Sequence, residues 1–264
     1  MCKVKFIWFR GLIFVAAILA PLVLPRGKSV SAGSQPARKA VVVELFTSEG
    51  CSSCPPADQL LGRLGSEPRS DGVEVIPLGF HVDYWNFQGW TDRFSSAAYS
   101  ERQIRYAHKF RIEGAYTPQL VFDGSEEGEG NDPARAHRLI ERAAQRPAAA
   151  AVQMKLSGNN LQIKVNAAKN LAGEVMLAYT EDNLASKISA GENNGRELRH
   201  SAVVRELRSL GRLHDGFENT VPLKLKKDWK RNDIRVVVFV EEPDNGAIDG
   251  AASLNLKDQA ASLR

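Results

Sequence analysis

The chain has 264 residues, of which 43% are hydrophobic and 25% charged, values close to the average for soluble globular proteins. This composition excludes a collagen, a disordered tail and a polytopic membrane protein, and three cysteines are too few for a disulfide-dense scaffold. The net charge of +4 arises at the N-terminus, because residues 1–32 hold five of the 35 basic residues and none of the 31 acidic ones. The rest of the chain is nearly neutral, so we expect no nucleic-acid partner.

Residues 1–32 have the pattern of a secretory signal peptide. Lys3, Lys5 and Arg10 precede an uncharged apolar run over residues 11–24, and small residues follow at positions 30–32. As a helix this run spans about 21 Å, which is short of a hydrocarbon core of ~30 Å. We therefore expect cleavage and a periplasmic or secreted protein. The alternative is an uncleaved anchor over residues 6–24, and only then would a membrane be a partner.

Residues 40–147 predict an α/β domain, because expected strands and helices alternate along them. Residues 33–39, which contain Gly, Ser and Pro, are expected to link this domain to the signal peptide. Asp132 followed by Pro133 is typical of a helix start, and Pro147 of a helix end. The expected strands are 40–47, 73–82 and 119–123, and the expected helices are 56–64, 95–110 and 133–146.

Residues 148–256 predict an all-β, sandwich-like domain, followed by a C-terminal tail over residues 257–264. Short segments that alternate apolar and polar residues are separated by turn signals such as Ser157-Gly158-Asn159-Asn160. The expected strands are 151–156, 161–165, 174–179, 200–210, 221–226 and 235–241.

The strongest chemical motif is Cys51-Ser52-Ser53-Cys54, between an expected strand and an expected helix. Two intervening residues let the sulfurs meet across one turn, and the N–H groups of a helix N-terminus favour a thiolate. In a redox-active pair Cys51 would attack and Cys54 would resolve the mixed disulfide. A static disulfide and a metal site stay open, although so short a bridge stabilises little by chain entropy.

In this context the residues resemble a thioredoxin-like domain. The strand VVVELF followed by the two cysteines matches that family's strand–CxxC–helix order, and YTPQLVFDG matches its cis-proline loop. The resemblance implies that Glu44 is a buried acid that accepts the proton of Cys54; the alternative is an ordinary carboxylate at the end of a strand, facing solvent. It also implies that Thr117 and Pro118 bind a peptide substrate beside the cysteines. We accordingly expect the Cys51 sulfur at the surface beside Thr117, and Cys54 deeper, next to Glu44.

A closer resemblance covers nearly the whole mature chain. The segments ELFTSEGCSSCPPAD, PLGFHVDYWNFQGW, YTPQLVFDG and ENNGRELRHSAVVREL are similar to a family of secreted bacterial proteins of unknown function. That family joins a thioredoxin-like domain to a β-rich C-terminal domain. The resemblance implies a fold and a compartment but no activity.

One departure from the thioredoxin pattern follows the second cysteine directly. Pro55 and Pro56 disfavour helical backbone at Cys54, because a residue before proline is pushed toward extended conformations. The helix is therefore expected to begin at Pro56, with weaker activation of Cys51 by the helix dipole.

Further candidate site residues follow the second expected strand. His81 and Asp83 are expected near the CxxC, because ligands and catalytic groups gather at the carboxyl ends of strands in α/β sheets. The alternative is that Asp83 caps the loop and His81 forms hydrogen bonds within it. Tyr84 and Trp85 are candidates for a substrate groove, with Phe87 and Trp90 beside them; the alternative is an apolar cluster beneath a long loop. Residues 192–200 are expected to form a hairpin turn, or else to contact the redox site.

These features predict an exported thiol–disulfide oxidoreductase that acts on protein thiols, or on a redox partner, without a cofactor. One alternative is a Cu(I) carrier that uses Cys51, Cys54 and His81, since soft thiolates select Cu(I). A second alternative is a binding module in which the CxxC does no chemistry.

Overall fold

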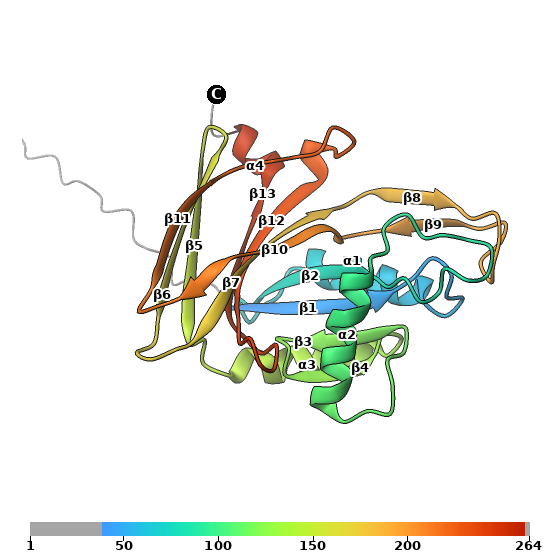
Figure 1. Ribbon diagram of the computed structural model, residues 1–264, viewed down its shortest axis with the longest axis horizontal. Helices are drawn as coiled ribbons and strands as arrows, with labels where there is room; N and C mark the ends of the chain where they lie inside the picture. The colour runs from blue at the N-terminus through green and yellow to red at the C-terminus, as the bar shows by residue number, and fades with distance from the viewer. Residues whose placement is uncertain (1–38, 262–264) are drawn as a thin grey trace, which may run out of the picture. The chain divides into compact units, whose positions relative to one another are not determined.

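The computed structural model describes residues 39–261 (Figure 1). The predicted signal peptide and all but the last residue of the predicted linker lie outside the described residues. Within the described part, no helix is both long and apolar enough to cross a membrane.

The first half of the chain alternates strands and helices as the sequence predicts. Asp132 caps the third helix, because its carboxylate accepts the backbone N–H of Arg135 at 2.8 Å. A fourth strand, not predicted, follows the turn at Gly124. The elements are β1 Ala40–Thr47, α1 Pro55–Ser66, β2 Glu74–His81, α2 Ala97–Phe110, β3 Gln119–Phe122, β4 Glu126–Glu129 and α3 Pro133–Gln145.

The second half consists almost entirely of strands. Five of the six expected strands are present. The sixth, expected over residues 221–226, shares only Val221 and Pro222 with β11, and residues 223–226 form no strand. Three more strands and a final helix, in place of the expected tail, were missed. The elements are β5 Ala150–Ser157, β6 Asn160–Ala167, β7 Gly173–Glu181, β8 Leu184–Lys187, β9 Glu197–His200, β10 Val203–Leu213, β11 Phe217–Pro222, η1 Arg231–Asp233, β12 Ile234–Glu241, β13 Ile248–Asn255 and α4 Leu256–Ala261.

A single mixed sheet of eight strands runs through both halves, in the order β13-β12-β7-β10-β2-β1-β3-β4. Strands β1 and β2 are parallel, and β3 pairs with β1 antiparallel. The halves meet where β10 runs parallel to β2 and the N–H of Gly79 donates to Ala202 O at 2.7 Å. A Cβ at position 79 would lie 3.3 Å from that oxygen, so glycine permits this close approach.

Strand β1 is buried on both faces and separates two clusters of apolar side chains. Val41, Val43 and Leu45 pack toward α1 and α3. On the opposite face, Val42 and Phe46 pack with α2 and with strands of the second half. A third cluster fills the space between the eight-stranded sheet and the three-stranded sheet β11-β6-β5.

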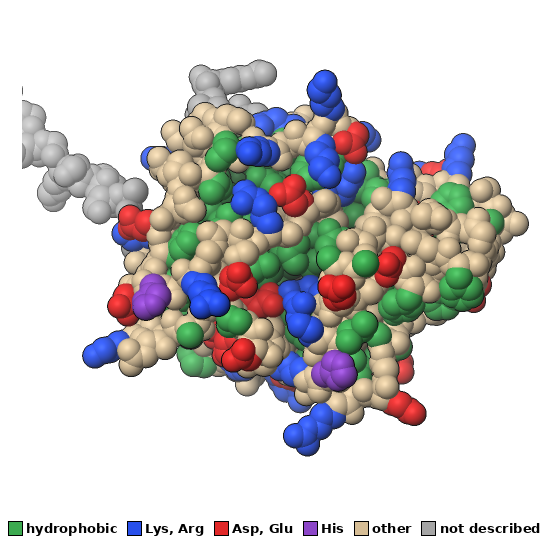
Figure 2. Space-filling model, in the orientation of Figure 1, with side chains coloured by type: hydrophobic (Ala, Val, Ile, Leu, Met, Phe, Trp, Pro, Cys, Tyr) green, Lys and Arg blue, Asp and Glu red, His purple; other side chains and the backbone are tan. Residues whose placement is uncertain are grey.

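The expected boundary near residue 147 therefore marks a change of secondary structure within one sheet. Two sheets do pack face to face in the second half, as in a sandwich, but β7, β10, β12 and β13 belong to the sheet that also holds β1 to β4. The remaining pair, β8 and β9, forms a hairpin that lies beside the end of the first half that carries the CxxC (Figure 1). On the face shown in Figure 2, basic and acidic side chains are interspersed.

Candidate functional site

Cys51 and Cys54 form a disulfide at the start of α1, directly after the turn that leaves β1. The expectation that the double proline keeps Cys54 out of helical backbone is wrong: α1 begins at Pro55, one residue earlier than expected, and Cys54 is its N-cap with φ −78° and ψ −35°. The carbonyl of Cys54 accepts the N–H groups of Ala57 at 2.9 Å and Asp58 at 3.1 Å. Pro55 and Pro56 have no backbone N–H, so the disulfide meets only the positive end of the α1 dipole and no free N–H donor of the first turn.

Both cysteines are buried, with 1% of Cys51 and none of Cys54 exposed, while Ser52 and Ser53 between them are exposed. The expectation that the Cys51 sulfur lies at the surface is therefore wrong. Its place beside Thr117 is confirmed, because Cys51 Sγ is 3.9 Å from Thr117 O. A reacting thiol must reach Cys51 through a local opening.

The loop between β8 and β9 covers the CxxC. The side-chain amide of Asn193, itself fully buried, donates to the carbonyls of Glu49 and Cys51, both at 2.9 Å. The carboxylate of Glu192 accepts the backbone N–H of Ser52 at 3.0 Å. Both expectations for residues 192–200 hold, because this segment forms a turn and also contacts the CxxC. The loop belongs to the second half of the chain.

The predicted substrate-binding residues lie beside the disulfide. The Thr117–Pro118 peptide bond is cis. Trp85 Nε1 donates to Thr117 Oγ1 at 2.8 Å, and the Trp85 ring stacks on Phe87, which is 74% exposed. Tyr84 is turned toward α2, where its hydroxyl donates to Gln103. Trp85 and Phe87 thus form a partly exposed aromatic surface next to the Thr117–Pro118 loop.

Gly50, immediately before Cys51, allows this surface to approach the disulfide loop. A Cβ at this position would lie 3.1 Å from both the Cβ and the carbonyl oxygen of Trp85. A larger residue would therefore push Trp85 and the CxxC turn apart.

The structure corrects the role expected for Glu44. Its carboxylate is fully buried, but Arg102 binds it at 2.6 and 3.0 Å and the hydroxyl of Tyr106 donates to it at 2.7 Å. Successive side chains of a strand point to opposite faces, so Glu44 shares the α2 face of β1 with Val42 and Phe46. Cys54 begins α1 on the other face, and the partners of Glu44 are therefore Arg102 and Tyr106.

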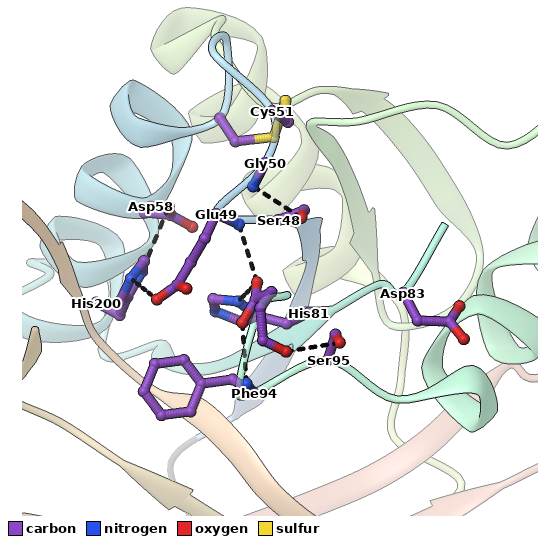
Figure 3. Close-up of polar contacts among 12 residues, drawn as sticks. Ser48, Glu49, Gly50, Cys51, Asp58, His81, Asp83, Phe94, Ser95 and His200 are labelled. Atoms are coloured by element: carbon purple, nitrogen blue, oxygen red, sulfur yellow. Dashed lines mark hydrogen bonds and ion pairs between the residues drawn. A yellow bond between two sulfur atoms is a disulfide. The ribbon is translucent and has the colours of Figure 1, made fainter. Parts of the chain in front are cut away.

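A different set of ionisable side chains lies beneath the CxxC turn (Figure 3). His200 Nε2 is 3.2 Å from Glu49 Oε1, and His200 Nδ1 is 3.6 Å from Asp58 Oδ2. Trp90 Nε1 donates to the other oxygen of Glu49 at 2.9 Å. Burial by itself lowers the pKa of His200, but the contacts with Asp58 and Glu49 raise it to about 9.

His81 belongs to the same buried region but not to a set of metal ligands. Its Nδ1 lies 2.7 Å from Asp92 Oδ2, and the same oxygen accepts the N–H of Glu49 at 2.9 Å. Among residues 39–261, no three His, Cys, Asp or Glu side chains are grouped as a metal ion would require. Asp83 instead holds its loop to α2, because its carboxylate accepts the Ser100 hydroxyl at 2.5 Å.

Five side chains at this site were not assigned from the sequence. Four of these five side chains lie within two of the sequence segments that carry the family resemblance, so the sequence did mark part of the site. These residues come together only because the β8–β9 hairpin packs against the first half of the chain. The sequence alone does not show that contact. The five side chains are Glu49, Asp58, Asp92, Asn193 and His200.

Comparisons with known proteins agree with this picture of one continuous fold. A protein of Agrobacterium tumefaciens solved by structural genomics is 30% identical, with a TM-score of 0.66 over 84% of this chain and 96% of that one. HBP35 of Porphyromonas gingivalis is 19% identical, with a TM-score of 0.62 over 83% of this chain and 75% of that one, and shows a similar fold alone. No curated protein matches the sequence. The model of a family described as "Protein of unknown function (DUF1223)" matches residues 42–241, and the chain belongs to this family.

Proposed function

We propose that this protein is an exported thiol–disulfide oxidoreductase whose first half has a thioredoxin-like fold and acts on protein thiols. One observation carries the proposal: the Cys51–Cys54 disulfide sits between β1 and the N-terminus of α1, with Cys51 Sγ 3.9 Å from the carbonyl of Thr117. The backbone at Thr117 and the aromatic surface of Trp85 and Phe87 are suited to hold an extended client segment beside the sulfur.

In this reaction Cys51 is the sulfur that bonds to the client. It lies beside Thr117, whereas Cys54 is fully buried as the N-cap of α1. The positive end of the α1 dipole favours negative charge on the sulfur that leaves or attacks. Export, expected from residues 1–32, would place the pair in a compartment where disulfides persist.

The burial of both cysteines favours a second candidate, a binding module that the disulfide merely holds together. The two candidates differ in whether the pair exchanges with other thiols. A disulfide that only stabilises the fold forms no mixed disulfide with clients.

Trapping of clients by single mutants separates the two candidates. In the exporting cell, Cys54→Ser should accumulate mixed disulfides with client proteins on non-reducing gels, because the resolving thiol is missing. Cys51→Ser should trap far fewer, and the double variant Cys51→Ser/Cys54→Ser, the control, should trap none. Absence of adducts for both single variants, together with no oxidation of a dithiol peptide by the purified protein, would leave the binding module.

A further inference from the structure

The exchange chemistry proposed above needs a proton for Cys54, and the buried cluster of Glu49, Asp58 and His200 is placed to provide it. The imidazole of His200 contacts one carboxylate through each ring nitrogen, at 3.2 Å and 3.6 Å. All three side chains are buried. A proton can therefore be kept within this cluster away from bulk solvent.

Asp58 connects the cluster to Cys54. It is the acidic residue of the first turn of α1, and its N–H donates to the carbonyl of Cys54 at 3.1 Å. Side chains four residues apart lie on the same face of a helix. Asp58 therefore lies one helical turn from Cys54 and also contacts His200 (Figure 3).

The charged groups around His200 determine the sign of the net charge of this cluster. The ring faces His81 at 5.0 Å between centroids, and His81 in turn contacts Asp92. The pKa of His200 is about 9, so its imidazole is protonated at neutral pH. One imidazolium between two carboxylates, Glu49 and Asp58, leaves a negative charge beneath Cys54, and this charge opposes a lasting thiolate there.

We propose that His200, acting through Asp58, delivers a proton to Cys54 when the disulfide opens and takes it back when the disulfide closes. The inference rests on the proposed function and assigns these residues a part in it. His200 is a positioning residue in this scheme, because it acts on Cys54 through Asp58 and does not contact the client.

The bonds and electrons balance for a client that carries two thiols. A client thiolate attacks Cys51 Sγ, a client–Cys51 disulfide forms, the Cys51–Cys54 bond breaks, and its electron pair goes to Cys54 Sγ. His200 Nδ1 gives its proton to the Asp58 carboxylate, and Asp58 passes that proton on to the Cys54 sulfur. The second client thiolate then displaces Cys51, which leaves as a thiolate and takes a proton from solvent. The client is oxidised to a disulfide and the protein is reduced to a dithiol; the two protons that the client thiols lost to solvent balance those taken up by Cys51 and, in return, by His200. Reduction of a client disulfide follows the same steps in reverse.

The test is the acidity of the Cys54 thiol, read from its thiolate ultraviolet absorbance as pH is varied. The full chain carries Cys2→Ser and Cys51→Ser, so that Cys54 is its only cysteine. His200→Gln removes the cation and should raise the pKa of Cys54 by about one unit, whereas Asp58→Asn removes a carboxylate and should lower it by about one unit. Shifts in opposite directions are the signature of a charge contact with Cys54.

The matched control is His214→Gln, because His214 is exposed and should leave the titration of Cys54 unchanged. Should His200→Gln fail to fold, Asp58→Asn carries the test alone. An unchanged Cys54 pKa in both folded variants, or shifts in the same direction, would overturn the inference.

This titration uses no client and so fails independently of the proposed function. If the Cys54 pKa shifts in opposite directions but no client is trapped, the charge contact with Cys54 stands and the proposed exchange reaction does not. Trapped clients with an unmoved Cys54 pKa would keep the oxidoreductase and refute the role of His200 and Asp58.

Discussion

Arg102 of α2 is buried between carboxylates from the two halves of the chain. It binds Glu44 of β1 at 2.6 Å and Glu241 of β12 at 2.7 Å, and only 2% of its side chain is exposed. Burial by itself lowers the pKa of Arg102, but the contact with the Glu44 carboxylate, and after it those with Tyr106 and Glu241, raise it well above its usual value. Glu44 is therefore a structural carboxylate, stabilised by a cation that it shares with Glu241.

Removal of this cation should destabilise the protein strongly. Arg102→Met leaves two buried carboxylates without their partner, and we expect the free energy of unfolding in urea to fall by about 3–5 kcal/mol. Arg105→Met on the same helix is the control. Arg105 is 59% exposed and its contact with Glu241 is long, at 3.8 Å, so its loss should cost no more than about 0.5 kcal/mol. Similar losses for both variants would contradict the structural role of Arg102.

Residue patterns predicted the cysteines but not the partner of each carboxylate. The CxxC is a local motif, so its disulfide and its position before a helix could be read from four neighbouring residues. The contact of Glu49 with His200 joins residues 151 positions apart, and depends on the path of a hairpin. The resemblance assigned an acid to Glu44, and the sequence held no sign that Arg102 would neutralise it.

At the scale of elements, the strands that were missed share a weak local signal. β4 (EEGE) is acidic and contains glycine, and β13 (IDGAASLN) is built from small residues with low strand propensity. β8 and β9 have four residues each. Pairing with neighbouring strands, and burial against the rest of the fold, override these local preferences.

The β8–β9 hairpin controls access to the disulfide through Asn193. Asn193→Ala removes the donors for two buried carbonyls, which costs about 1–3 kcal/mol of local stability. Because reduction requires the loop to open, dithiothreitol should reduce the Cys51–Cys54 disulfide roughly tenfold faster or more. The rate at which the disulfide is lost is measured by alkylating the freed thiols and counting the labels by mass spectrometry.

The exposed neighbour provides the control for this measurement. Asn194→Ala changes the same residue type in the same loop, where the side chain is exposed, and should leave the reduction rate unchanged. Equal rates for the wild-type protein and Asn193→Ala would mean that the loop does not limit access to the sulfurs.

At the scale of the whole molecule, the change from alternating elements to strands alone suggested two domains. The eight-stranded sheet instead crosses the expected boundary, through a pairing in which β2 and β10 share one register pair, Val203 with Gly79. Periodicity locates strands but does not say which strands pair across a hundred residues. The α2 face of the sheet is completed by second-half side chains: Ala178, Val204, Val237, Phe239 and Ile248.

Shared burial of this kind should make the described part of the chain unfold as one cooperative unit. Residues 40–147 alone would expose the apolar α2 face of β1 and β2, and would leave Glu44 and Arg102 without Glu241. We therefore expect one transition in urea, seen at the same midpoint by probes in both halves.

Tryptophans placed on both sides of the expected boundary make this measurable. In a chain that carries Trp8→Phe, Trp229→Phe leaves Trp85 and Trp90 as fluorescent reporters within the first half, and Trp85→Phe/Trp90→Phe leaves the buried Trp229 within the second. Because each substitution can shift stability, circular dichroism of the same variant gives its reference midpoint. Fluorescence and circular dichroism should coincide in both variants, since neither half keeps its core without the other. A fluorescence midpoint that departs from circular dichroism in opposite directions in the two variants would show that the halves unfold separately, and that the shared sheet does not couple them.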